Sequence, residues 1–144
     1  LDNLIQSIIP LFQETENLSL EYRPFKSAAK PSVFVDKEQI VRVLNNLIKN
    51  SVDATSEKDN RKIIIALSER QNQFIVMVKD NGCGIDAKEK NKIFTPKFTT
   101  KSSGMGLGLA IVKNIISNSD GDVWFDSEIG VGSSFYFSLP KHSE

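Results

Sequence analysis

The sequence lacks the features that mark several common protein classes. Its only cysteine is Cys83, so no disulfide can form within the 144 residues, and the chain suits a reducing compartment. Lysine plus arginine and aspartate plus glutamate both total 18, so the net charge is zero, without the basic excess of a typical nucleic-acid-binding domain. The sequence shows no signal peptide and no apolar run long enough to span a bilayer. These absences favour a cytoplasmic domain that is not embedded in a membrane and binds no nucleic acid.

A chain of this length, 40% hydrophobic and without internal repeats, fits one domain over residues 1–144 with its own core. It begins within an apolar-periodic segment and without an initiator methionine, so we expect a fragment of a longer protein. Helices are predicted over residues 1–16 with a break at Pro10, 36–55, 87–94 and 107–119. Strands are predicted over 18–25, 33–35, 62–67, 74–78, 123–126 and 134–139, with turns at 69–73 and 130–132 closing two hairpins. The expected class is an α/β two-layer sandwich with a mixed sheet.

The helix predicted over residues 36–55 has two different faces. Its apolar face, which should be buried, consists of Ile40, Val43, Leu44, Leu47, Ile48 and Ser51. On the other face Asn46, Asn50 and Asp53 follow an i, i+4, i+7 spacing, so their side chains line up. Asparagine is a mediocre helix former, yet its carbonyl oxygen suits magnesium, a hard cation that takes oxygen ligands. This face alone leaves a solvated surface and a metal-binding surface equally open.

A first glycine cluster, Asp80-Asn81-Gly82-Cys83-Gly84-Ile85, follows the strand predicted over residues 74–78. A carboxylate just past the strand end, at Asp80, can accept a hydrogen bond from an exocyclic amine such as adenine N6. Gly82 and Gly84 lack a Cβ atom, so the backbone can approach a flat base closely and adopt positive φ. Asp-Asn-Gly is also a frequent turn sequence, so a plain turn is favoured until the next cluster is considered.

A second cluster, Gly104-Met105-Gly106-Leu107-Gly108, leads into the last predicted helix. Glycines at a helix N-terminus expose backbone N–H groups and the positive end of the helix dipole, which together can hold a phosphate. The spacing is neither the dinucleotide fingerprint nor a P-loop. The preceding polar loop, residues 95–104, is typical of a lid, and its Lys101 can reach a terminal phosphate. Three alternating glycines exceed what a helix cap needs, so phosphate binding is favoured over a cap with a flexible loop.

Five motif segments occur in order along the chain, at residues 46–54, 80–85, 93–101, 104–110 and 130–140. In this order they resemble the asparagine box, the first glycine box, the phenylalanine box with its lid, the second glycine box and the closing hairpin of the GHKL (Bergerat-fold) ATPase and kinase superfamily. The resemblance covers nearly the whole chain and is closest to the catalytic ATP-binding domain of bacterial two-component sensor histidine kinases, with features of the nitrogen-regulation type. It implies a mixed, mostly antiparallel sheet covered on one face by helices.

The resemblance implies ATP as the ligand and assigns the residues that bind it. Asp80 would bind adenine N6, with Gly84 beneath the ring and Ser133 assisting through water. The other nucleotide-binding positions would be Gly82, Ile85, Asp53, Gly104, Gly106, Leu107 and Gly108. Three positions depart from the family pattern. Lys97 intrudes before Phe98 where the phenylalanine box usually reads Phe-x-Pro-Phe, Ser133 stands where threonine is commoner, and Asp53 stands where many kinases have lysine.

The resemblance also implies magnesium as a cofactor. Asn50 would be the metal ligand, with Asn46 nearby on the same helix face. Lys101 would approach the γ-phosphate, so Asn46, Asn50 and Lys101 would be the catalytic residues. Phe94 and Phe98 would pack the base of the lid and help dock a partner domain.

One residue separates a kinase from a hydrolase in this superfamily. Hydrolytic relatives place a general-base glutamate four residues before the metal asparagine, where this chain has Asn46, an amide that cannot take a proton. A kinase needs no such base, because its acceptor histidine lies on another domain. The only histidine here, His142, is expected to be a solvated tail residue. The implied partners are therefore a histidine-bearing dimerisation domain of the same protein, acting in cis or in trans, and a downstream response regulator, and the parent protein can be anchored in the inner membrane.

Two other functions remain open at this point. A stand-alone serine protein kinase of the anti-sigma type shares the fold, but only a sensor histidine kinase has a helical hairpin with a histidine upstream. A non-catalytic module would hold nucleotide without transferring phosphate. The presence of Asp80, Asn50 and all the motif glycines counts against a decayed site.

Overall fold

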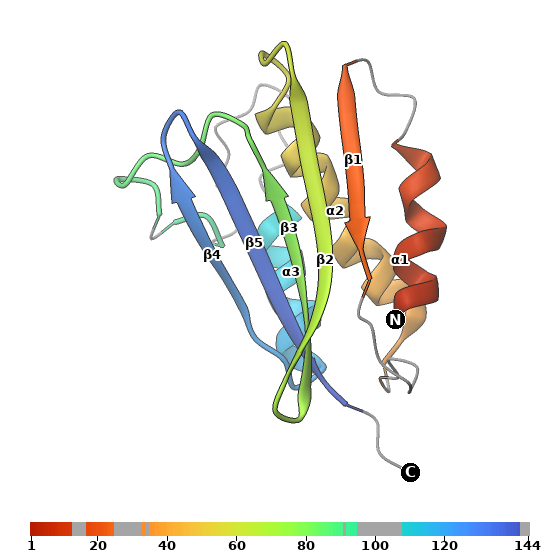
Figure 1. The fold of residues 1–144 in the computed structure, drawn as a ribbon. Coiled ribbons are helices and arrows are strands. Elements are labelled where there is room, and N and C mark those ends of the chain that lie inside the picture. The colour runs from red at the N-terminus through yellow and green to blue at the C-terminus, as the bar shows by residue number, and fades with distance from the viewer. Residues whose placement is uncertain (13–16, 25–32, 34, 91, 95–107, 142–144) are drawn as a thin grey trace.

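The computed structural model describes residues 1–12, 17–24, 33, 35–90, 92–94 and 108–141. The elements, in chain order, are α1 (Asp2–Ile8), the 3₁₀ turn η1 (Ile9–Leu11), β1 (Leu18–Arg23), α2 (Lys37–Ala54), β2 (Arg61–Arg70), β3 (Gln73–Asp80), α3 (Gly108–Asn118), β4 (Val123–Glu128) and β5 (Gly132–Pro140). They form a sheet and a layer of helices (Figure 1). α1 ends before Pro10, which lies in η1, so the predicted break is confirmed.

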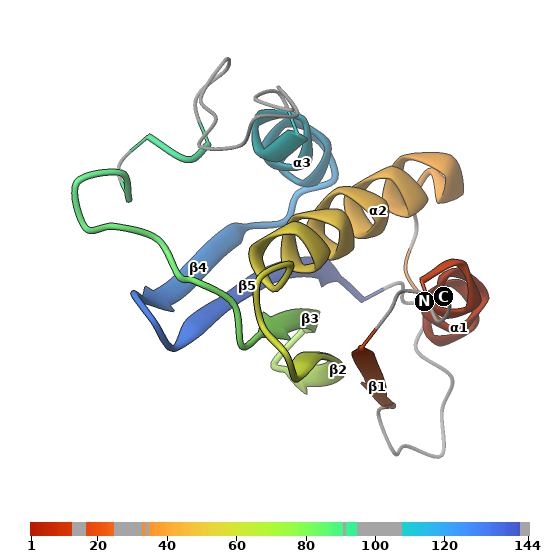
Figure 2. The same cartoon turned by 90° about the horizontal axis from the view of Figure 1, so that it is seen from above.

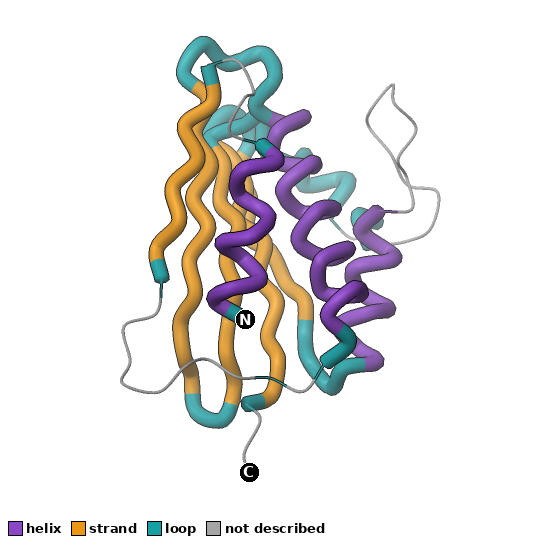
Figure 3. Tube along the Cα trace, turned by 90° about the vertical axis from the view of Figure 1, so that its right-hand side faces the viewer, coloured by secondary structure: helices purple, strands orange, loops and turns teal. Residues whose placement is uncertain are grey.

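The described strands form a five-stranded sheet in the order β1-β2-β3-β5-β4, so β3 lies at its centre. β1 pairs with β2 in parallel, and the other neighbouring pairs are antiparallel. α1, α2 and α3 all lie on one face of the sheet (Figure 2 and Figure 3). The predicted two-layer sandwich with a mixed, mostly antiparallel sheet is confirmed. None of the described helices has both the length and the apolar character that a membrane crossing requires.

The core lies between the sheet and the helices, as the alternation of side chains along the strands requires. The buried residues of β3 are Phe74, Val76, Val78 and Asp80. The buried residues of α2 are Ile40, Val43, Leu44, Leu47, Ile48 and Ser51, which is the predicted apolar face. The predicted start of this helix is confirmed as well, because the Asp36 carboxylate accepts a hydrogen bond from the Glu38 N–H at 3.0 Å.

The prediction of a helix over residues 87–94 is wrong. The described part of this segment consists of turns, closed by i to i+3 hydrogen bonds such as the one from the Glu89 N–H to the Asp86 carbonyl (2.8 Å). Eight residues are too few to form a stable helix from local propensity alone. The segment is instead tied to β4, because the Lys90 Nζ donates to the Ser127 carbonyl at 2.8 Å.

Two strand predictions also differ from the structure. Neither Val33 nor Val35 lies in a strand, contrary to the strand predicted over residues 33–35. The first hairpin is longer than predicted, because the register pairs Arg70 with Gln73 and leaves only two residues for the turn. Backbone pairing continues past the last apolar residue of each strand, so the hydrophobic pattern underestimates the length of these two strands.

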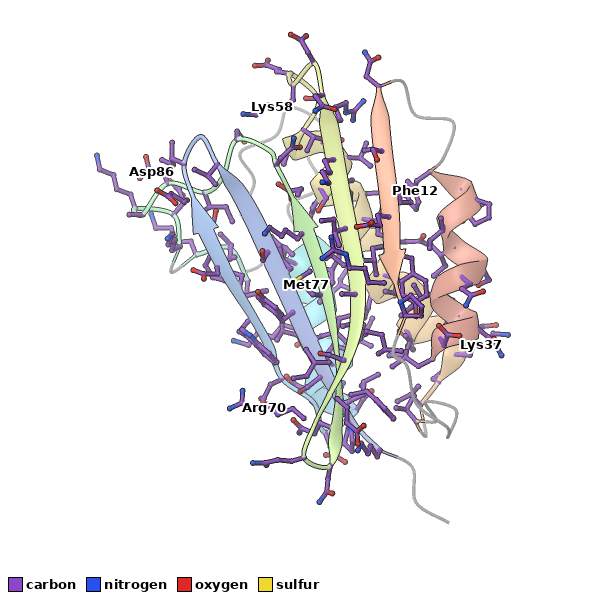
Figure 4. The ribbon with its side chains drawn as sticks, viewed as in Figure 1. Phe12, Lys37, Lys58, Arg70, Met77 and Asp86 are labelled. Carbon is purple, nitrogen blue, oxygen red and sulfur yellow. The ribbon has the colours of Figure 1, made fainter. Side chains whose placement is uncertain are left out.

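The C-terminal ends of α2 and β3 meet at the same end of the sheet. Figure 4 shows Lys58, shortly after α2, and Asp86, shortly after β3, at this end, with Arg70 at the opposite end. Arg61 stabilises the C-terminal end of α2, since its Nη2 donates to the Val52 carbonyl at 2.7 Å. A cation at this position also complements the negative end of the helix dipole.

Replacing Ser51 with alanine should stabilise the domain. Ser51 is 1% exposed, and within the described part of the chain its hydroxyl oxygen has no hydrogen-bond partner. A buried unpaired polar group costs about 1–3 kcal/mol and alanine is the better helix former, so Ser51→Ala should raise the free energy of unfolding by about 1 kcal/mol. The matched control is Ser117→Ala, because Ser117 is exposed on α3 and shares only the gain in helix propensity. Urea unfolding checks this, and a lower midpoint for Ser51→Ala would contradict it.

Candidate nucleotide-binding site

Asp80 is the last residue of the central strand and is 5% exposed. Its Oδ1 accepts a hydrogen bond from the Gly82 N–H at 2.9 Å and another from the Ser133 N–H at 3.3 Å. The second bond follows from the sheet register, which places Asp80 opposite Ser133 on β5. A buried carboxylate needs hydrogen bonds to offset its lost hydration, and these two backbone donors hold it in one orientation. The side chain is therefore a fixed hydrogen-bond acceptor at the end of the sheet.

The fold itself requires glycine at positions 82 and 84, whether or not a ligand is bound. A Cβ atom on Gly82 would lie 2.6 Å from the Ala54 carbonyl oxygen, and Cys83 N–H donates to that same carbonyl at 3.1 Å. Gly84 has φ of 77°, and a Cβ atom there would collide with the Glu128 carbonyl. These glycines therefore let the loop after β3 pass between the end of α2 and the end of β4. The sequence prediction assigned their lack of side chains to a bound base, a role that these contacts do not test.

Asn81 lies within the same motif but serves the sheet. Its Oδ1 accepts from the Lys62 N–H at 2.9 Å, and its Nδ2 donates to the Asn60 carbonyl at 2.7 Å. These bonds close the entrance to β2 beside the end of β3. They explain why an asparagine follows Asp80 without giving it a part in ligand binding.

A pair of serines lies beside Asp80. Ser133 is 6% exposed, and its Oγ is 2.8 Å from the Oγ of Ser127 on β4. Ser127 also accepts from the Ile85 N–H at 2.8 Å, so it joins the loop after β3 to the last hairpin. Sequence reasoning selected Ser133 and Ile85 and missed Ser127. The signal that identifies Ser127 is the register of the hairpin, which sets it opposite Ser133.

The asparagine face of α2 points away from the sheet. Asn46 and Asn50 are half-buried and Asp53 is exposed, whereas the apolar face of the same helix is buried. A Cβ atom on Gly108, the first residue of α3, would lie 3.4 Å from the Asn46 Oδ1. The structure therefore brings Asn46 against the start of α3, where the second glycine cluster ends. Lys101, Gly104, Gly106, Leu107 and Phe98 lie outside the described residues.

The oxygen donors on α2 suit magnesium, which takes only some of its ligands from the protein, better than a metal whose ligands all come from the protein. Among the described residues, no group of three or more histidine, cysteine, aspartate or glutamate side chains could hold a metal ion. Magnesium accepts a few protein oxygens and takes its remaining ligands from phosphates and water. The amide oxygens of Asn46 and Asn50 suit such a shared site.

Phe94 anchors the segment that precedes the predicted lid. Its ring packs edge-on against Phe125 at 5.9 Å and against Phe135 at 6.5 Å between centroids. Lys113 Nζ on α3 lies 5.8 Å from the centroid of the same ring. Phe94 thus packs against β4, β5 and α3, and its predicted roles at the base of the lid and in docking a partner domain remain predictions.

Comparison with known proteins identifies the family. Residues 35–143 match the family described as histidine kinase-, DNA gyrase B- and HSP90-like ATPase. The chain belongs to this ATPase family, and the GHKL resemblance predicted from the sequence motifs is confirmed.

Two relatives that match the chain are named as histidine kinases. WalK of Bacillus subtilis is 32% identical over 143 residues, which cover 95% of this chain and 23% of WalK. AtoS of Escherichia coli is 41% identical over 105 residues, which cover 73% of this chain and 17% of AtoS. The chain thus spans less than a third of the length of these relatives.

A solved structure matches the chain over almost its full extent. The catalytic domain of histidine kinase ThkA is 34% identical and superposes with a TM-score of 0.86, covering 98% of this chain and 92% of that domain. ThkA in complex with the response regulator protein TrrA matches with a TM-score of 0.80 and 32% identity, covering 99% of this chain and 40% of that chain. The chain therefore corresponds in extent and fold to a histidine kinase catalytic domain.

Replacing Asp80 with asparagine should weaken the binding of adenine nucleotides about ten- to hundredfold. The amide keeps the size of the side chain but turns one acceptor into a donor, and a mismatched buried polar group costs about 1–3 kcal/mol. Asp126→Asn is the matched control, because Asp126 is exposed on β4 and should leave the affinity unchanged. Titration calorimetry with a non-hydrolysable ATP analogue and magnesium measures both variants. Equal affinities for the wild type and Asp80→Asn would refute the assignment of Asp80 to the base.

Proposed function

We propose that this chain is the ATP-binding catalytic domain of a sensor histidine kinase, which binds Mg-ATP and donates the γ-phosphate to a histidine on a separate dimerisation domain. The observation that carries the proposal is the fixed carboxylate of Asp80 at one end of the sheet, with the amide face of α2 directed toward the start of α3. Membership of the ATPase family and similarity to histidine kinase catalytic domains support the same conclusion.

The described residues form two regions, one that binds the base of the nucleotide and one that binds its metal. At the end of β3, Asp80 accepts from the amino group of the base, with Ser133 beside it and with Gly84 and Ile85 on the loop that follows the strand. Near the start of α3, Asn50 holds magnesium through its amide oxygen, and Asn46 lies beside Gly108. When bound, magnesium supplies positive charge that offsets the charge developing on the transferred phosphoryl group.

The proposal extends to the residues that lie outside the described part. Lys101 contributes a cation near the γ-phosphate, and Gly104, Gly106 and Leu107 contribute backbone N–H groups near the phosphates. Asp53, exposed near the end of α2, lies on the same helix face as Asn46 and Asn50 and completes the polar surface beside the nucleotide. These residues act by positioning the nucleotide and balancing its charge.

The proposed function requires two partners, a domain that carries the acceptor histidine and a protein that later receives the phosphate. Residues 1–144 form a single catalytic domain, and the histidine lies on a dimerisation domain upstream in the same protein. A response regulator receives the phosphate afterwards, as the ThkA–TrrA complex supports. ATP-dependent signalling of this kind places the domain in the cytoplasm, whatever anchors the parent protein.

Phosphotransfer tests the proposed function directly. The chain is mixed with γ-labelled ATP, magnesium and the histidine-bearing domain of its parent protein. The expected product is a labelled partner whose phosphate is lost in acid and kept in base, as for phosphohistidine. An acid-stable product would identify a serine kinase, and binding without any transfer would identify a non-catalytic module. Asn50→Ala should abolish transfer through the loss of the metal ligand, whereas Asn118→Ala, at the far end of α3, should retain it.

The chain alone should hydrolyse ATP far more slowly than about 1 per second, the rate of an ordinary enzyme. Asn46 occupies the position where a hydrolytic base would be needed, and an amide cannot take a proton from water. Asn118→Ala, at the far end of α3, should leave this low background unchanged. Phosphate release by the purified chain measures both rates. Turnover at or above the ordinary enzymatic rate would mean that another group activates water.

A further inference from the structure

Ser127 forms more contacts around the base site than its half-buried position on β4 suggests. Its hydroxyl lies 2.8 Å from the Ile85 N–H, 3.2 Å from the Gly132 carbonyl and 2.8 Å from the Ser133 hydroxyl. Its backbone carbonyl accepts from Lys90 Nζ at 2.8 Å. The residue therefore connects the loop after β3 to the hairpin that presents Ser133.

The Ser127 hydroxyl has a single proton, which limits how its three contacts can all be hydrogen bonds. A serine hydroxyl has one proton to donate and two lone pairs to accept with. The Ile85 N–H can only donate to Ser127, and the Gly132 carbonyl can only accept from it. Ser127 thus gives its single proton to Gly132, and its remaining lone pair is filled only if Ser133 donates. This is the one arrangement in which all three contacts are hydrogen bonds.

The same arrangement fixes the chemical character of Ser133. Because the proton of Ser133 is directed at Ser127, the Ser133 oxygen presents lone pairs on its other sides. Its own backbone N–H is directed at the Asp80 carboxylate. Two acceptor groups, the Ser133 hydroxyl oxygen and the Asp80 carboxylate, therefore occupy the buried end of the site.

We propose that Ser127 is a positioning residue that makes Ser133 a hydrogen-bond acceptor, so that the site selects a purine with an amino group at position 6 over one with an oxygen there. An amino group donates to acceptors, whereas a carbonyl oxygen at the same position would meet acceptors and leave them unpaired. Ser127 does not touch the base itself. This inference rests on the proposed function, because it concerns the base site of the ATP-binding domain.

Comparing two nucleotides separates this role from a purely structural one. Adenosine and inosine triphosphates differ at position 6 of the purine, where an amino group replaces an oxygen, and at the adjoining ring nitrogen. If Ser127 merely held the loop in place, its removal would weaken both nucleotides alike. If it sets the proton of Ser133, removal lets that hydroxyl rotate and donate, which weakens ATP and favours inosine triphosphate in relative terms.

The experiment measures the affinities of both nucleotides, with magnesium, by calorimetry on Ser127→Ala. We expect the preference for ATP to fall about tenfold, the effect of one hydrogen bond, with ATP carrying most of the loss. Ser127→Thr keeps the hydroxyl on a strand position and should restore the preference. Ser134→Ala is the matched control, because Ser134 is the next residue on β5 and lies on the other face of the sheet. An unchanged preference in Ser127→Ala would overturn the inference.

A double-mutant comparison tests whether Ser127 acts through Ser133. In a Ser133→Ala background, the further change Ser127→Ala should alter the preference less than twofold, because the hydroxyl that it orients is already gone. Additive effects would overturn the inference. If Ser127→Ala does not fold, Ser127→Cys preserves the size of the side chain and replaces it in both comparisons. Failure of the wild-type chain to bind ATP would instead refute the proposed function, so the two failures are distinguishable.

Discussion

The buried carboxylate of Asp80 is the constraint on which the rest of the site depends. A charge that is 5% exposed must recover by hydrogen bonding what it loses in hydration. One of its donors belongs to the turn after β3 and the other to β5, so a single side chain connects a turn and a strand that are distant in sequence. A shift of β5 by one residue would remove the Ser133 donor and turn that strand's inner face outward. The register of the sheet therefore also sets the geometry of the proposed base site.

α2 gives the site its second half. One face of this helix supplies six buried residues to the core, so the orientation of the helix on the sheet is set by packing. That orientation directs Asn46 toward Gly108 and sets the asparagine face beside the start of α3. The end of the helix reaches the other half of the site, where the Ala54 carbonyl accepts from Cys83. Packing of the apolar face of α2 thus positions its asparagine face, which does not itself have to stabilise the fold.

The sequence predicted the features that depend on local chemistry. The six buried positions of α2, its cap at Asp36 and the two hairpins follow from periodicity and turn residues, and the structure confirms them. Features that depend on distant contacts were missed or wrongly explained. Ser127 becomes significant only when the hairpin register places it beside Ser133, and the helix predicted over residues 87–94 is replaced by turns held through Lys90. The need for glycine at positions 82 and 84 comes from carbonyl groups of α2 and β4, which no single-sequence pattern reveals.

We infer that the fixed Asp80 carboxylate at the end of β3 binds the base, while the asparagine face of α2 binds the metal and the phosphates. A crystal structure of the chain with magnesium and a non-hydrolysable ATP analogue measures this most directly. We expect the amino group of adenine within about 3 Å of the Asp80 carboxylate and a magnesium ion within about 2.1 Å of the Asn50 amide oxygen. A nucleotide bound with its base away from Asp80, or with its metal held only by residues outside α2, would contradict it.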